Sequence, residues 1–122
     1  MDLFHNPEGY EIVLGDGGST AFWDVASFSL AEGKAQALVH GEFGSKFASA
    51  LKAPWLDTPT VINGTPGSRL ELQAEAGVSL YAYAQNETST GVVTPVKRVS
   101  GVDDGALFLT DATSAAGGID FD

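Results

Sequence analysis

Cysteine is absent from the 122-residue sequence, and long apolar runs are missing as well. Without cysteine, neither a disulfide framework nor a cysteine-based zinc site can hold the fold together, so burial of apolar surface must do so. No run of about 18 apolar residues is present that could cross a bilayer, and residues 1–8 lack the basic and apolar regions of a secretion signal. These absences predict a soluble protein without a membrane partner.

Positive charge is the next shortage. Six Lys and Arg stand against sixteen Asp and Glu, which gives an acidic protein with a formal net charge of -10. Such a surface repels phosphate backbones, so free nucleic acid is not an expected partner. The acidic excess is steepest toward the end, where no Lys or Arg follows Arg98 and five aspartates occur: Asp103, Asp104, Asp111, Asp120 and Asp122. We expect residues 111–122 to form an extended C-terminal arm. This arm could lie on a neighbouring subunit or fold back on its own domain.

Groups suited to catalysis are few. His5 and His40 are the only histidines, and no HExxH pair, G-x-S-x-G elbow or cysteine nucleophile is present. Asp103, Asp104 and Asp111 could supply oxygens to Ca²⁺, but their spacing does not match a calcium-binding loop. We therefore predict no catalytic residue, no cofactor, no metal site and no enzyme.

A glycine-rich stretch, GDGGST at residues 15–20, has the composition of a phosphate-binding loop. It lacks the lysine of such a loop, and Phe22 and Trp23 after it continue like a strand. We therefore expect a hairpin turn or a bulge here.

Period-two alternation is the main positive signal. Apolar residues occupy every second position over 68–76, and the alternation resumes over 78–84. Turn-forming residues recur about every ten residues, a spacing typical of short antiparallel strands. The sequence predicts an all-β fold: one antiparallel β-sandwich domain over residues 1–122, Ig-like or jelly-roll-like. About eight short strands are expected, at 10–14, 20–30, 35–43, 60–62, 68–76, 78–84, 92–99 and 106–110.

One segment departs from this pattern. Phe47, Ala48 and Leu51 have helical spacing, and Pro54 follows where a helix has to stop, so one short helix is expected near residues 45–52. Trp55 then lies in an irregular loop, where it either makes contacts with a partner or plugs the end of the sandwich.

Residues 67–84 (GSRLELQAEAGVSLYAYA), preceded by residues 17–23 (GGSTAFW), are similar in style to small β-sandwich structural proteins of tailed bacteriophages. Such proteins decorate or cement the capsid or form head fibres, and they are non-enzymatic and often trimeric. The resemblance implies a viral structural protein: a capsid decoration protein on the virion surface, bound to the major capsid protein as a homo-oligomer, with a trimer favoured. The expected interface residues are Trp55, Tyr81, Tyr83, Ile119 and Phe121.

A second reading stays open from the same residues. Tyr81 and Tyr83 alternate away from the aliphatic face of their strand, so they either pack across strands or stand exposed for binding. A row of exposed aromatics with Trp55 would suit a carbohydrate-binding or receptor-binding β-sandwich module that stacks sugar rings.

Overall fold

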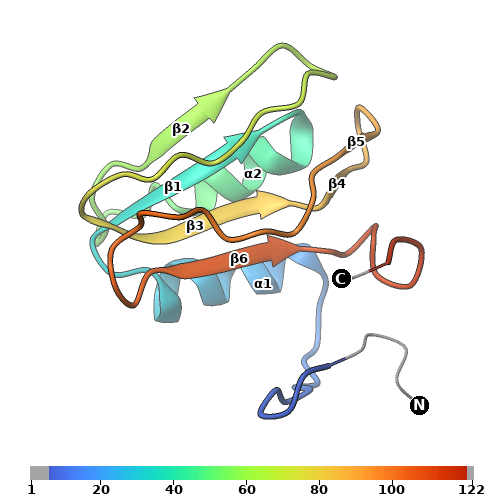
Figure 1. The fold of residues 1–122 in the computed structure, drawn as a ribbon, viewed down its shortest axis with the longest axis horizontal. Helices are drawn as coiled ribbons and strands as arrows, with labels where there is room; N and C mark the ends of the chain where they lie inside the picture. The colour runs from blue at the N-terminus through green and yellow to red at the C-terminus, as the bar shows by residue number, and fades with distance from the viewer. Residues whose placement is uncertain (1–5, 121–122) are drawn as a thin grey trace.

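A four-stranded parallel sheet organises the chain, in a computed structural model that describes residues 6–120 (Figure 1). The strand order is β2-β1-β3-β6, and every neighbouring pair in this sheet is parallel. A separate hairpin joins β4 and β5 in antiparallel pairing. The elements are α1 (Ser19–Val25), the π-helical turn η1 (Ala26–Leu30), β1 (Lys34–Val39), α2 (Glu42–Ala50), β2 (Thr60–Asn63), β3 (Val78–Ala84), β4 (Asn86–Glu87), β5 (Val92–Val93) and β6 (Leu107–Asp111).

The helices cover one face of the sheet (Figure 1). Phe47 of α2 is 1% exposed, and its ring lies 6.0 Å from that of Trp23 in α1. Small residues of the strands make room for these rings, since Ala37 of β1 and Ala82 of β3 belong to the same buried cluster. The large side chains of the helices therefore fill the space that the small strand residues leave.

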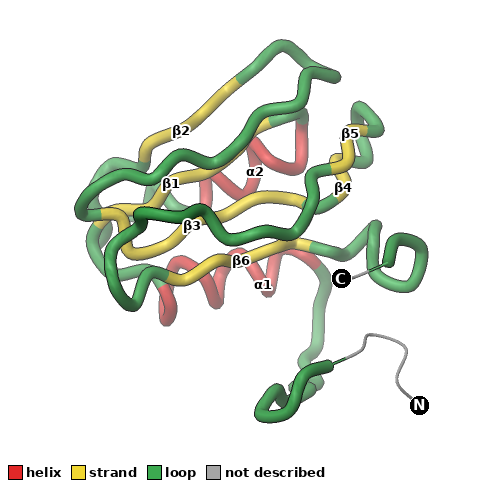
Figure 2. The backbone as a smooth tube through the Cα atoms, in the orientation of Figure 1, coloured by secondary structure: helices red, strands yellow, loops and turns green. Residues whose placement is uncertain are grey.

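Irregular chain covers the other face, and Figure 2 shows these loops lying over the sheet and running back along the strands. Tyr81 and Tyr83 of β3 point into this layer, where they pack with Leu38 and Leu72. The ring of Tyr81 stacks on Phe108 at a centroid distance of 5.0 Å. The central strands are therefore buried on both faces, as is usual in parallel sheets.

The predicted antiparallel β-sandwich is wrong. Residues 68–76 are not a strand: they lie extended on the loop-covered face, with Leu72 buried and Arg69 and Glu71 exposed. Alternation of apolar and polar residues indicates an extended segment with one side buried. The backbone of such a segment need not form hydrogen bonds with a neighbouring strand. Residues 78–84 do form β3, but its neighbours β1 and β6 come from far along the chain and are parallel to it.

The predicted strand at 20–30 is also wrong, because this segment is helical throughout, as α1 followed by η1. Its buried positions, Trp23, Ala26 and Ser27, have helical spacing. Residues 10–14 form no strand either. The helix expected near 45–52 corresponds to α2, which begins three residues earlier.

The remaining strand predictions differ mainly in their ends. Residues 35–43 hold β1 and the start of α2, 60–62 lie within β2, 92–99 hold only the two residues of β5, and 106–110 overlap β6. Residues 112–120 form consecutive turns, in which Ala115 is buried. A single domain over 1–122 with an arm at 111–122 stays a prediction. In the part of the chain from residue 6 to 120, no helix is long and apolar enough to cross a bilayer.

The segment before α1 projects from the body of the fold (Figure 1). Ile12, Val13 and Leu14 are 72%, 85% and 93% exposed. Three consecutive aliphatic side chains in water are unfavourable for an isolated chain, because a contiguous apolar surface favours association.

The aromatic contacts under α2 should carry much of the stability. Phe47→Ala removes a fully buried ring, and we expect the free energy of unfolding to fall by about 3–5 kcal/mol. Phe28→Ala is the matched control, because Phe28 is 67% exposed. Urea denaturation of both variants measures the difference, and equal losses would contradict this account of the core.

A polar cluster at the amino ends of β1 and β2 should make stability depend on pH. Glu75 forms an ion pair with Lys34 and accepts hydrogen bonds from Gln36 Nε2 (3.0 Å) and Thr60 Oγ1 (2.9 Å). Lys34 first, and then Gln36 and Thr60, hold the pKa of Glu75 below its ordinary value of 4.5. A lowered pKa stabilises the fold above 4.5, and that contribution is lost as the pH falls through the folded-state value.

Glu75→Gln removes this titration. We expect the variant to lose less stability than the wild type between pH 7 and pH 3, by up to about 1 kcal/mol for this partly exposed cluster. Urea denaturation at both pH values measures the difference. Parallel losses in the two proteins would show that Glu75 does not contribute in this way.

Candidate functional site

A cavity of about 140 Å³ opens at the carboxyl ends of β3 and β6, beside the first turns of α1 and α2. Ligand sites in open α/β sheets lie at this end of the strands, where loops and helix starts converge. Its lining residues come from four parts of the chain: Ser19, Phe43, Ala84, Asn86, Thr88, Asp111, Thr113 and Ser114.

Asp111 is the charged group of this cavity. It is the last residue of β6, and it is 7% exposed. Its Oδ2 accepts a hydrogen bond from Trp23 Nε1 at 2.9 Å, and its Oδ1 accepts one from the backbone N–H of Thr113 at 3.0 Å. Each carboxylate oxygen can accept a further hydrogen bond, so the group is fixed in place and still able to bind a donor in the cavity.

Hydroxyl groups form much of the remaining wall. Ser19 Oγ donates to Thr113 Oγ1 at 2.8 Å, which ties the start of α1 to the turn after β6. Ser114 Oγ accepts from Thr88 Oγ1 at 2.8 Å and from Asn86 Nδ2 at 3.0 Å. These bonds join three segments that are far apart in the sequence.

Phe43 supplies the apolar side of the cavity. It lies in the first turn of α2, half-buried against the helix-covered core. Lys46 Nζ stands 5.3 Å from the ring centroid and forms an ion pair with Glu42 at 2.7 Å. The cavity therefore combines a flat ring, a buried carboxylate and several hydroxyls.

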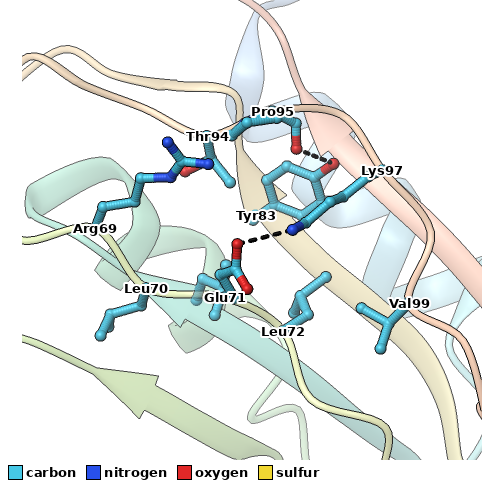
Figure 3. Close-up of a pocket in the computed structure, with 10 residues that line it drawn as sticks. Arg69, Leu70, Glu71, Leu72, Tyr83, Thr94, Pro95, Lys97 and Val99 are labelled. Atoms are coloured by element: carbon cyan, nitrogen blue, oxygen red, sulfur yellow. Dashed lines mark hydrogen bonds and ion pairs between the residues drawn. The ribbon is translucent and has the colours of Figure 1, made fainter.

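A second hollow lies on the loop-covered face, between residues 69–72 and 94–99 (Figure 3). Lys97 pairs with Glu71 at 2.7 Å across it and holds the pKa of that carboxyl below its ordinary value. Tyr83 Oη donates to the carbonyl of Pro95 at 3.4 Å. Its free volume is about 10 Å³, room for about one water molecule. This hollow is a packing crevice between loops.

The predicted interface residues do not lie together. Tyr81 and Tyr83 are buried, at 0% and 2% exposure. Trp55 is half exposed; its indole N–H donates to the carbonyl of Ser27 at 2.9 Å, and its ring lies 4.5 Å from that of Phe28. Ile119 is partly buried in the last turn, and Phe121 lies outside the described residues. An interface role for these residues stays a prediction.

Metal-ligating residues do not converge among residues 6–120, where no group of three or more His, Asp or Glu could hold an ion. Asp103 and Asp104 precede β6 and Asp111 ends it, so the strand separates them. His40 is buried, with Nδ1 3.0 Å from the carbonyl of Ser68 and Nε2 3.1 Å from Thr94 Oγ1. His5 lies outside the described residues.

Several residues of the cavity carried signals that sequence reasoning set aside. The stretch at 15–20 was expected to be a turn before a strand, yet Ser19 and Thr20 begin a helix, as in a phosphate-binding loop. The sequence offers Asp111 as a calcium-ligand candidate and as the first residue of an acidic arm. It predicts Phe43 at the end of a strand, and no signal distinguishes Asn86 and Thr88 from other loop residues.

Comparison with known proteins gives a consistent relationship. No family profile matches the chain. It is 54% identical over 123 residues to a phosphoserine aminotransferase from Nocardioides sp., covering 99% of this chain and 33% of that protein. A putative phosphoserine aminotransferase from Mycobacterium leprae is 50% identical, over 99% of this chain and 32% of its own length. The chain therefore spans about a third of the length of the curated relatives it matches.

Solved structures agree on the fold. A phosphoserine aminotransferase from Cytophaga hutchinsonii matches 98% of this chain and 34% of its own, with a TM-score of 0.84 and 24% identity. An alanine–glyoxylate aminotransferase from Nostoc sp. matches 85% of this chain and 30% of its own, with a TM-score of 0.62 and 20% identity. The mixed α/β architecture with its parallel sheet is therefore part of an aminotransferase fold.

These relatives overturn the predicted function. They are bacterial aminotransferases, so the capsid decoration role, the major capsid protein as partner in a trimer, the virion location and the resemblance to bacteriophage proteins are wrong. The alternative of a carbohydrate-binding module fails for the same reason. The prediction of no enzyme is contradicted as well, because the relatives are enzymes. The resemblance rested on the alternation of apolar and polar residues in residues 67–84. This pattern occurs in parallel sheets whose faces are covered as well as in β-sandwiches.

Proposed function

We propose that this chain forms the cofactor pocket and part of the central sheet of a phosphoserine aminotransferase, with pyridoxal 5′-phosphate held at the cavity around Asp111. The observation that carries the proposal is the buried Asp111 carboxylate at the carboxyl end of β6. Sequence identity of 50–54% to phosphoserine aminotransferases supports it.

The residues of the cavity fit this cofactor. A carboxylate is a recurrent partner for the protonated ring nitrogen of pyridoxal phosphate, and Asp111 is fixed by Trp23 and Thr113 for such a contact. Phe43 offers a flat apolar surface to a heteroaromatic ring. The hydroxyl pair of Ser19 and Thr113 keeps one hydrogen that it could donate to a phosphate.

The amine that anchors the cofactor covalently is not supplied by the described part of the chain. None of its four lysines lines the cavity: Lys34, Lys46 and Lys97 are held in ion pairs, and Lys52 follows α2. We infer that this lysine comes from outside these 122 residues.

When bound, pyridoxal phosphate supplies an electron sink for the amino group that is transferred. The chain's own contribution is electrostatic and geometric. The Asp111 carboxylate would favour a proton on the ring nitrogen of the bound cofactor, because a negative charge beside a base favours its protonated form. Trp23 keeps that carboxylate oriented, and Phe43 would shield one side of a bound ring from water.

Binding of pyridoxamine 5′-phosphate tests the proposal, because this form of the cofactor has no aldehyde and cannot react with surface lysines. We expect saturable binding in equilibrium dialysis, with a Kd below about 1 mM. Asp111→Asn should weaken it about tenfold or more, since charge-assisted hydrogen bonds are the strong ones. The matched control is Asp104→Asn, an exposed aspartate before the amino end of β6.

Trp23 reports where the ligand sits, because its indole is bonded to Asp111. In a Trp55→Phe background, Trp23 is the remaining tryptophan, and its emission should change along the same binding curve. Undetectable binding by the wild type, or identical Kd values for Asp111→Asn and Asp104→Asn, would refute the assignment of this cavity.

A further inference from the structure

Glu87 is a buried carboxylate that the proposed function leaves unexplained. Its side chain is 0% exposed, and no Lys or Arg in residues 6–120 pairs with it. Its Oε1 accepts from the backbone N–H of Gly44 at 2.9 Å, and its Oε2 accepts from the N–H of Phe43 at 3.3 Å and from Ser89 Oγ at 3.1 Å. A buried charge without a counter-ion persists only when hydrogen bonds satisfy it, so these donors fix the carboxylate.

The two α2 backbone donors, the N–H groups of Phe43 and Gly44, belong to the first turn of that helix. The residue before the helix is Gly41, which has no side chain to cap it. Ser89 Oγ accepts the N–H of Glu42 at 3.0 Å, and Glu87 accepts the next two. The helix is therefore capped by residues more than 40 positions later in the chain, and the carboxylate also faces the positive end of the helix dipole.

Glycine permits this close approach. A Cβ at Gly41 would overlap Ser89 Oγ and lie 2.9 Å from Glu87 Cγ. A Cβ at Gly44 would lie 3.0 Å from the carbonyl oxygen of Leu38 and 3.2 Å from Val39 Cα. The start of α2 is thus fitted against both Glu87 and the end of β1.

The cap connects two walls of the cavity. Phe43, whose N–H Glu87 holds, lines one side, while Asn86 and Thr88 line another. Neighbouring residues in an extended chain point to opposite sides, so Glu87 faces α2 while Asn86 and Thr88 face the cavity. A shift of Glu87 would therefore change the distance between the Phe43 side of the cavity and the side formed by Asn86 and Thr88.

We infer that Glu87 is a positioning residue for the cofactor pocket: it locks the Phe43 wall to the Asn86–Thr88 wall through the first turn of α2. The inference rests on the proposed function for the identity of the ligand. The lock itself depends only on the contacts of Glu87, and it can be measured without ligand.

The test compares Glu87→Ala with Glu75→Ala. Both substitutions remove a carboxylate that accepts several hydrogen bonds, but Glu75 lies at the amino ends of the strands, away from the cavity. For Glu87→Ala we expect amide hydrogen exchange at Phe43 and Gly44 to accelerate about tenfold or more, as for loss of a helix cap. We also expect the Kd for pyridoxamine 5′-phosphate to rise about tenfold. Glu75→Ala should leave both unchanged while lowering the thermal midpoint.

Ser89→Ala is the second variant, in case Glu87→Ala does not fold. Ser89 is exposed, and its loss removes one donor to Glu87 and the acceptor for the N–H of Glu42. Ser89→Ala should raise the amide exchange rate at Glu42. It should also raise the Kd for pyridoxamine 5′-phosphate, by less than Glu87→Ala does.

The outcomes separate the two hypotheses. Wild-type exchange and wild-type Kd in the Glu87 and Ser89 variants overturn the positioning role alone. The same holds if Glu75→Ala weakens binding as much as they do, because the effect would then be general destabilisation. If the wild-type protein does not bind the ligand, the proposed function fails, and the exchange rates of Phe43 and Gly44 in the Glu87→Ala variant still decide whether Glu87 holds the two walls together.

Discussion

Parallel strands have to be covered on both faces, and this constraint shapes the whole chain. The helices α1 and α2 cover one face of the sheet, and irregular segments cross the other. Long connections are needed between parallel strands, and here they double as the covering layers. Because the strands run the same way, their carboxyl ends meet the starts of both helices at one edge. The cavity lies there because the topology brings the fixed side chains and free backbone donors together.

Two buried carboxylates organise that edge, and neither is paired with a cation in the described structure. Asp111 is held by an indole N–H and a backbone N–H, and Glu87 by backbone N–H groups and a hydroxyl. Neutral donors fix a carboxylate in place while leaving its charge uncompensated. At Asp111 that charge is directed at the cavity, and at Glu87 it is directed at the start of α2. A carboxylate held by neutral donors is thus available to a ligand at Asp111, and at Glu87 it fixes the start of α2.

The sequence predicted local properties better than it predicted the fold. Residues 78–84 form a strand as expected, and a helix occupies much of 45–52. The pairing of strands could not be derived, because alternation in residues 68–76 reflects one-sided burial of an extended loop and carries no information about backbone partners. Helix α1 was missed because Phe22 and Trp23 favour strands locally, whereas the spacing of Trp23, Ala26 and Leu30 was the stronger signal.

The site was hidden for a related reason. Its residues are spread from Ser19 to Ser114, and each is common in loops. Only the parallel topology brings these residues together, and the predicted antiparallel sandwich gave no reason to place them at one site. The glycine-rich stretch before α1 was the one local clue, and its meaning depended on whether a helix or a strand came next.

The hydroxyl wall has a property that fixed charges lack. Serine and threonine can each donate or accept, and the hydroxyl hydrogen rotates freely about the C–O bond. Ser19 and Thr113 can therefore exchange the roles of donor and acceptor while every heavy atom stays where it is. Such a surface adapts its polarity to whatever charge develops beside it, at the cost of no more than a bond rotation.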